Sequence, residues 1–224
     1  MTMFRLLRAA LFALACLNAS AASSALTIGP ADPGPGYYQV AGVAAQDALN
    51  MRAEPDANAE IVGTLPPGAR PVEVLEVRRI GAAAWGRVLA DDANAWVSMR
   101  FLEPFEVTMI KGTQIPAGLV CGGTEPFWSA ALGDDGLAFS TPDQEERVAG
   151  LTSTATAIGR NNRFAVLAAG KGERLTAVLA QNEQCSDGMS DRDFRWRVDL
   201  LMERAGDSDY PQLYEGCCRL PVSR

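Results

Sequence analysis

The chain has 224 residues, of which 48% are hydrophobic, and it carries a formal net charge of −7 and no histidine. This apolar content supports a packed core and excludes a disordered chain. The acidic charge disfavours binding to nucleic acid or to anionic lipid, because both carry negative charge. The lack of histidine excludes Ser-His-Asp and Cys-His catalysis and removes the usual zinc ligand.

Residues 1–25 have the order of charged, apolar and small residues that is typical of a secretory signal peptide. Arg5 and Arg8 precede the apolar run ALFALACL, and the small residues NASAASSA follow. We expect cleavage near residues 21–25, which would remove both arginines and take the net charge from −7 to −9. The run is too short to span a bilayer, so no transmembrane helix is expected. The sequence therefore predicts a periplasmic or secreted protein.

A lipoprotein is the alternative for this N-terminal segment. Leu14-Ala15-Cys16 places a small residue directly before a thiol, as lipid modification requires. However, the residue three positions before Cys16 is Ala13 rather than a larger aliphatic residue, so we favour the cleaved form without a lipid.

Four cysteines remain in the mature chain, namely Cys121, Cys185, Cys217 and Cys218. An even number in an exported chain predicts disulfide bonds. Adjacent cysteines seldom bond to each other, because the small ring is strained. We therefore expect Cys121 and Cys185 each to pair with one of the two adjacent cysteines, in either combination. No CxxC motif is present, so redox or metal chemistry at these thiols is not expected.

Residues 26–35 are rich in glycine and proline and are predicted to be a linker. Residues 36–104 then contain short alternating segments separated by turn residues, which predict five or six strands in a small antiparallel barrel. One segment illustrates the pattern: Val72, Val74 and Val77 alternate with Glu73 and Glu76, as in a strand with one buried and one exposed face.

This region resembles the bacterial SH3-like (SH3b) domain. The resemblance is carried in order by ALNMRAEPDANAEIVGTLPPGA, WGRV and AWVSMRFLEP, although Met51 replaces the usual valine and Glu54-Pro55 stands where Gly-Pro is common. It implies a module that binds cell-wall peptide or another envelope protein, and no catalysis. Candidate binding residues are Tyr37, Tyr38, Asn50, Arg52 and Trp85. For Trp85, as for Trp96, a position inside the barrel is the favoured alternative.

Residues 105–117 are predicted to be a second linker, and residues 118–224 to form a disulfide-linked antiparallel β-barrel or sandwich. Segments such as FWSAAL, RFAVLAAG and FRWRVDLLM predict six to eight strands. No helical periodicity is sustained, although VDLLMERA fits either a short helical turn or the end of a strand. The fold class predicted for the whole chain is all-β.

Three motifs stand out in this second region: CGGTEPFW at residues 121–128, CSDGMSDR at 185–192 and GCCR at 216–219. Together they resemble a widespread set of bacterial envelope proteins and lipoproteins of no assigned activity. In this chain Phe194-Arg195-Trp196 replaces a tyrosine-proline segment of that pattern. The resemblance implies a fold and a compartment but no reaction.

Side chains within these motifs form a second candidate site, made of Glu125, Trp128, Asp187, Asp191 and Arg192. Paired carboxylates could act as general acid and base if the disulfides bring the loops together. The favoured alternative is that the two aspartates hydrogen-bond to backbone amides in a tight turn. The spacing does not match a calcium loop, and no cofactor motif is present, so neither a metal nor a cofactor is expected.

The sequence thus predicts a non-enzymatic envelope protein that binds cell-wall peptide or another envelope protein through the SH3b-like region. Two alternatives remain open. One is a carboxylate-dependent hydrolase of cell-wall or glycan material, and the other is a carrier of a small apolar ligand in the C-terminal region.

Overall fold

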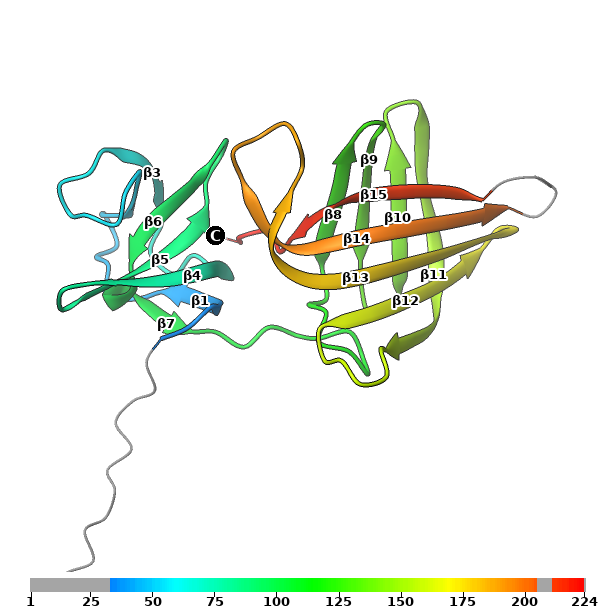
Figure 1. Cartoon of the computed structure of the whole chain (residues 1–224), viewed down its shortest axis with the longest axis horizontal. Coiled ribbons are helices and arrows are strands. Elements are labelled where there is room, and N and C mark those ends of the chain that lie inside the picture. The colour runs from blue at the N-terminus through cyan, green and yellow to red at the C-terminus, as the bar shows by residue number, and fades with distance from the viewer. Residues whose placement is uncertain (1–32, 205–210, 224) are drawn as a thin grey trace, which may run out of the picture. The chain divides into compact units, whose positions relative to one another are not determined.

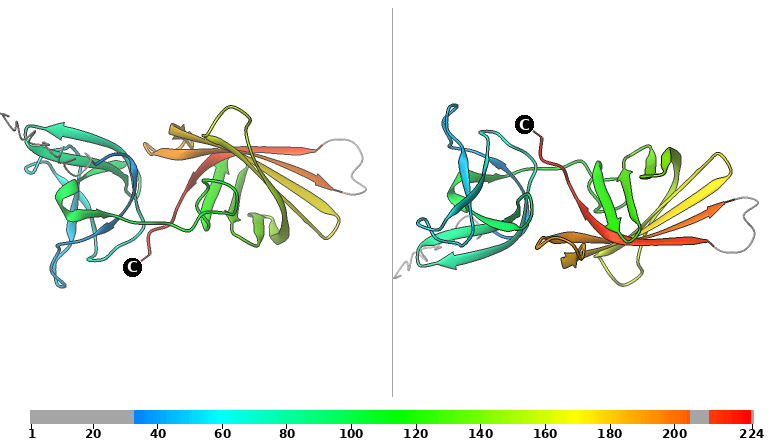
Figure 2. Two further views of the ribbon diagram at one scale, coloured as in Figure 1. Left: turned by 90° about the horizontal axis from the view of Figure 1, so that it is seen from below. Right: turned by 90° about the horizontal axis from the view of Figure 1, so that it is seen from above.

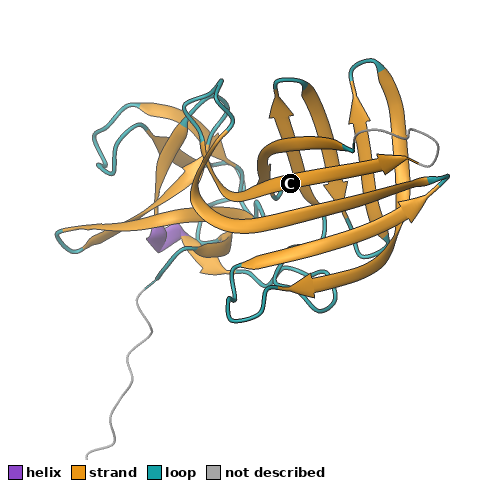
Figure 3. Cartoon of the chain, turned by 45° about the vertical axis from the view of Figure 1, so that its right-hand side comes forward, coloured by secondary structure: helices purple, strands orange, loops and turns teal. Residues whose placement is uncertain are grey.

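A computed structural model describes residues 33–204 and 211–223, without the side chains of residues 182 and 183. The predicted signal peptide, Cys16 and residues 26–32 of the predicted linker lie outside these residues. The described residues form strands, turns and one 3-10 helix, η1 (Met99–Phe101), which confirms the all-β class (Figure 3). Residues Pro33–Arg224 form one compact unit, so the division into two domains stays a prediction.

The first part of the described chain forms a seven-stranded antiparallel sheet (Figure 1). Its order is β3-β2-β6-β5-β4-β1-β7. The segment AWVSMRFLEP was predicted as one strand, but η1 divides it into two. The strands are β1 (Gly36–Val40), β2 (Leu49–Arg52), β3 (Ile61–Leu65), β4 (Val72–Ile80), β5 (Ala83–Leu89), β6 (Asn94–Ser98) and β7 (Leu102–Pro104).

The second part forms a closed barrel in which every neighbouring pair is antiparallel (Figures 1 and 2). Its first and last strands in the sequence, β8 and β15, pair with each other and complete the closure. The strands are β8 (Leu119–Thr124), β9 (Phe127–Leu132), β10 (Gly136–Thr141), β11 (Gln144–Thr156), β12 (Arg163–Gly170), β13 (Glu173–Ser186), β14 (Asp193–Arg204) and β15 (Gln212–Arg219).

Alternation along the barrel strands places the apolar side chains inside. In β9, Trp128, Ala130 and Leu132 are buried while the residues between them are exposed. β14 alternates in the same way to Met202 and extends as a strand to Arg204, so the helical alternative for VDLLMERA is wrong over its described residues. Successive side chains of a strand point to opposite faces, and a closed barrel gives every strand an inner face.

The segment predicted as the second linker also contributes to the barrel core. Ile110 and Ile115 are fully buried within the core cluster. The Ile110 amide donates to the Ile115 carbonyl at 2.8 Å, and the Thr113 hydroxyl donates to the Ile110 carbonyl at 2.8 Å. This hydrogen-bonded turn presents both isoleucines to the barrel interior. Among the residues that the structure describes, no helix has the length and apolarity needed to cross a bilayer.

Candidate functional site

A groove of about 980 Å³ lies on the seven-stranded sheet. We call it the arginine groove, because three arginines line it together with aromatic and small residues. Three of the candidate binding residues, Asn50, Arg52 and Trp85, are among its lining residues. Three further lining residues that favour ligand binding were not predicted from the sequence. These are Arg79, Arg100 and Phe101.

The alternation of side chains along β2 explains why two of its polar residues line this groove. Leu49 and Met51 are buried and belong to the apolar core of the sheet, whereas Asn50 and Arg52 are partly exposed. Adjacent side chains of a strand point to opposite faces, so the residues that anchor β2 in the core also turn Asn50 and Arg52 to the groove. The Arg52 side chain is then held by a 2.6 Å hydrogen bond from its Nη1 to the Ala59 carbonyl.

Trp85 is buried, but it lies outside the apolar core cluster of the sheet. Its neighbour Gly86 faces that core, because a Cβ at Gly86 would lie 2.6 Å from the Met99 sulfur. Trp85 therefore points to the opposite face, where it lines the groove. Trp96 is likewise buried and outside the cluster, with the Arg78 guanidinium 4.5 Å from its ring centroid. The two tryptophans thus cover the outer face of β5 and β6, although both were expected inside.

Tyr37 and Tyr38 do not line the arginine groove. The Tyr38 hydroxyl donates to the Gly34 carbonyl at 2.6 Å, and its side chain is part of the apolar core. The Tyr37 hydroxyl donates to Glu73 Oε1 at 3.2 Å and accepts a hydrogen bond from Trp196 Nε1 at 3.1 Å. Both tyrosines therefore have structural contacts that sequence reasoning did not anticipate.

Glu73 was expected on the exposed face of its strand, but its side chain is only 4% exposed. The reason is that Tyr37 and Leu220 contact Glu73 on this face of β4, and Tyr37 also accepts a hydrogen bond from Trp196. Burial raises the pKa of Glu73 to about 7, although the charge of Arg195, the Tyr37 hydroxyl and the Leu220 amide oppose the rise. Its Oε2 atom has no hydrogen-bond partner. This hydrogen-bond network runs from Glu73 of β4 through Tyr37 of β1 to Trp196 of β14.

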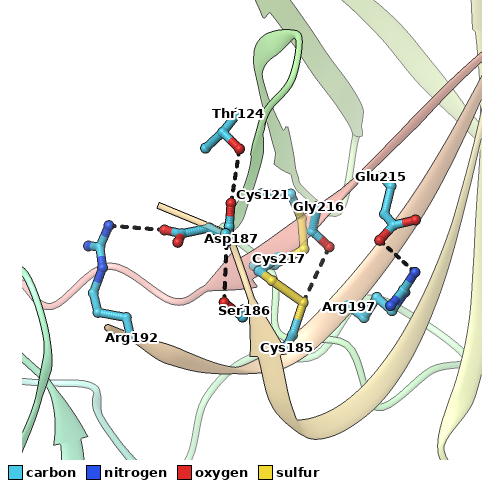
Figure 4. The surroundings of a disulfide bond; sticks show 12 residues. Cys121, Thr124, Cys185, Ser186, Asp187, Arg192, Arg197, Glu215, Gly216 and Cys217 are labelled. Atoms are coloured by element: carbon cyan, nitrogen blue, oxygen red, sulfur yellow. Dashed lines mark hydrogen bonds and ion pairs between the residues drawn. A yellow bond between two sulfur atoms is a disulfide. The ribbon is translucent and has the colours of Figure 1, made fainter. Parts of the chain in front are cut away.

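The four cysteines form two disulfides, Cys121–Cys218 and Cys185–Cys217 (Figure 4). This confirms the predicted pairing scheme and fixes which of the two combinations occurs. Cys218 faces the barrel core opposite Cys121 of β8, whereas Cys217 packs in a separate cluster with Cys185 and Phe194. The two cysteines can bond to different partners because adjacent positions of β15 point to opposite faces.

Asp187 organises the turn that follows Cys185. Its Oδ1 accepts from the amides of Ser190 at 2.8 Å and Met189 at 3.0 Å, and Arg192 Nη2 lies 3.4 Å from Oδ2. Burial alone would raise the pKa of Asp187, but these donors outweigh it and hold the pKa below its ordinary value. The Thr124 hydroxyl donates to the Asp187 carbonyl, which joins this turn to the turn after β8 (Figure 4).

The structure does not bring the candidate carboxylates together in any recorded contact. Glu125 and Asp191 are exposed, and no hydrogen bond joins either side chain to Asp187 among the described residues. The oxygens of Asp187 are already engaged by its own turn. This arrangement matches the structural alternative for the CSDGMSDR motif better than acid-base chemistry.

Trp128 and the glycines of the motifs pack against each other. Trp128 is buried, stacks on Phe139 with centroids 6.0 Å apart, and donates from Nε1 to the Glu215 carbonyl at 3.2 Å. A Cβ at Gly123 would lie 2.3 Å from Nε1 of the indole. The CGGTEPFW motif therefore supplies the buried Trp128, and its glycines together with the glycine of GCCR leave room for the indole ring.

Replacing Gly216 by alanine should lower the free energy of unfolding by about 2 kcal/mol, as overpacking of a well-packed site does. The added Cβ would lie 2.1 Å from the Gly122 carbonyl oxygen and 2.9 Å from Trp128, so β8 or β15 would have to move. Gly150→Ala on β11 is the control, because its Cβ would meet its nearest atom at an ordinary 3.9 Å. Urea unfolding followed by tryptophan fluorescence would measure both. Equal losses in the two variants would contradict this role.

Comparison with known proteins characterises only the first sheet. A family model described as the bacterial SH3 domain matches residues 47–103, a stretch that contains β2 to β6 and most of the arginine groove. The SH3b resemblance inferred from the sequence is thereby confirmed for these residues. No curated protein and no solved structure matches the chain. The barrel of β8 to β15 lies outside the matched residues.

Proposed function

We propose that the chain is an exported envelope protein that binds cell-wall peptide through the arginine groove. The observation that carries this proposal is the groove itself, which lies mostly within the residues that match the bacterial SH3 domain and combines polar, cationic and aromatic side chains. Ligand sites typically join apolar walls to a few fixed polar groups in this way. Two disulfides are consistent with an oxidising compartment outside the cytoplasm.

The two alternative functions gain less support. Asp187 is committed to its turn, so a hydrolase acting through Glu125 and Asp187 has no assembled carboxylate pair. The barrel interior holds a cluster of large side chains that includes Trp128, Phe139 and Trp196, which occupies space that a small apolar ligand would need. We therefore propose a binding module rather than either of these.

Co-sedimentation with purified sacculi tests the proposed function. The unaltered protein should pellet with the wall. The double variant Asn50→Ala, Arg52→Gln should bind about tenfold more weakly, because it loses the ligand hydrogen bonds of the Asn50 amide and of the charged Arg52 guanidinium. Both residues are only partly exposed, so thermal unfolding must show that the variant remains folded.

Arg163→Gln is the matched control, since this exposed arginine lies on β12 of the barrel and outside the groove. Its retention on sacculi should equal that of the unaltered protein. If the unaltered protein stays in the supernatant, or if the control loses as much binding as the groove variant, the proposed function is wrong.

A further inference from the structure

The charge of the arginine groove is opposite to that of the chain. The whole chain carries 27 acidic and 20 basic residues. Among the described residues that line the groove, three are arginines, Arg52, Arg79 and Arg100, and one is an acid, Asp47. A concave site with one sign of charge concentrates ligands of the other sign. Because the surrounding protein is acidic, this local reversal points to an anionic ligand.

The guanidinium groups come from three separate elements and are held in different ways. Arg52 on β2 is fixed by its hydrogen bond to the Ala59 carbonyl. The Arg100 guanidinium, in η1, lies 4.4 Å from the centroid of the Phe101 ring, so the aromatic face supports it while its N–H groups remain at the edge. Arg79 stands exposed near the end of β4. A guanidinium has five N–H donors, so the hydrogen bond of Arg52 to Ala59 leaves other N–H groups of Arg52 for a ligand.

Asp47, the acid among the described lining residues of the groove, is engaged by its own loop. Asp47 Oδ1 accepts a 2.8 Å hydrogen bond from the Ala48 amide, which turns the carboxylate toward its own loop. The walls between the arginines consist largely of small residues, such as Ala44, Ala57 and Ala83. Small walls leave room for a peptide backbone over Trp85.

We infer that the arginine groove selects peptides through their carboxylates and engages at least two of them with its guanidinium groups. This inference rests on the proposed function and narrows its ligand from wall peptide in general to peptide with free carboxylates. Guanidinium and carboxylate groups form paired, charge-assisted hydrogen bonds, whereas a carboxamide offers neither the charge nor the two equivalent oxygens. Neutral peptide bridges, such as glycine chains, would be poor ligands of this groove.

Calorimetric titration of the full mature protein with two matched peptides tests the inference. One is Ala-Glu-Glu-Ala with a free C-terminus, and the other is Ala-Gln-Gln-Ala with an amidated C-terminus. The free acid should bind at least about tenfold more tightly, since the amide form loses hydrogen bonds between charged groups. Its affinity should fall as salt rises, because ions screen exposed charges.

Variants locate this preference in the groove. Arg79→Gln and Arg100→Gln should each weaken binding of the free acid by about five- to tenfold and leave the amide form unchanged, whereas Arg163→Gln should alter neither. Both groove arginines are exposed, so these substitutions preserve the fold.

Equal binding of the two peptides, or no binding of the free acid at about 1 mM, would overturn the inference. The outcomes are separable from those of the proposed function. If sacculi retain the protein but the two peptides bind equally, the protein binds the wall without selecting carboxylates. If the peptide binds through its carboxylates but sacculi do not retain the protein, the groove is a site for anionic peptides whose natural ligand is not the wall.

Discussion

Replacing Cys121 and Cys218 together by alanine should lower the free energy of unfolding by about 4 kcal/mol. The Cys121–Cys218 bond closes a loop with a sequence separation of 97 residues, and the loss of chain entropy in the unfolded state grows with loop length. Both cysteines are buried, so alanine introduces no polar group into the core. Urea unfolding under non-reducing conditions, followed by tryptophan fluorescence, would measure the change.

The second disulfide provides an internal comparison for this result. Cys185–Cys217 has a sequence separation of only 32 residues, so replacing both of its cysteines by alanine should cost about 1 kcal/mol less than the first pair. The barrel should remain folded with either bond alone. A larger loss for the Cys185–Cys217 pair would show that loop closure does not determine what these bonds contribute.

The unfolding free energy should fall as the pH rises from 5.5 to 8, by about 2 kcal/mol from Glu73 alone. The pKa of this carboxyl is raised from 4.5 to about 7, so the folded chain holds the proton more tightly than the unfolded chain does. Its contribution is complete below pH 4.5 and is lost as the pH rises through about 7, a total of about 3 kcal/mol. Denaturant unfolding at a series of pH values would record this slope.

The Glu73→Gln variant should flatten this dependence, because the amide does not ionise. The Tyr37 hydroxyl, which faces Glu73, does not titrate in this window, because burial and the nearby Glu73 charge raise the pKa of Tyr37 above its ordinary value. The chain has no histidine, the side chain that ordinarily changes charge in this range. Glu106→Gln, at an exposed position, should keep the slope of the unaltered protein. An unchanged slope in Glu73→Gln would refute the assignment.

Local patterns predicted the strands well because each depends on neighbours in the sequence. The segments VEVLEVRRI, FWSAAL and RFAVLAAG coincide with β4, β9 and β12. The same patterns misplaced Glu73, because β4 has a second buried face that the contacts with Tyr37 and Leu220 create. Alternation within a strand cannot reveal that a distant part of the chain covers its outer face.

The same distinction between local pattern and tertiary packing applies to the candidate sites. Asn50 and Arg52 were predicted as binding residues from the SH3b-like motif, and both line the groove; Trp85, for which a position inside the barrel was favoured, lines it as well. Arg79 and Arg100 were missed, because they lie at the ends of different elements and only the folded sheet brings them together. The choice between the two cysteine pairings also needed the register of β15 against β8, which places Cys218 opposite Cys121.

The Cys121–Cys218 bond joins β8 and β15, the first and last strands of the barrel in the sequence. Cys121 lies in β8, before the loops that join the barrel strands, and its partner Cys218 lies in β15, after them. A protease that cuts the backbone once, anywhere from residue 122 to residue 216, would therefore leave two fragments still joined through sulfur. If the protein is exported as proposed, a single cut in a barrel loop by an extracellular protease would therefore not separate the two fragments.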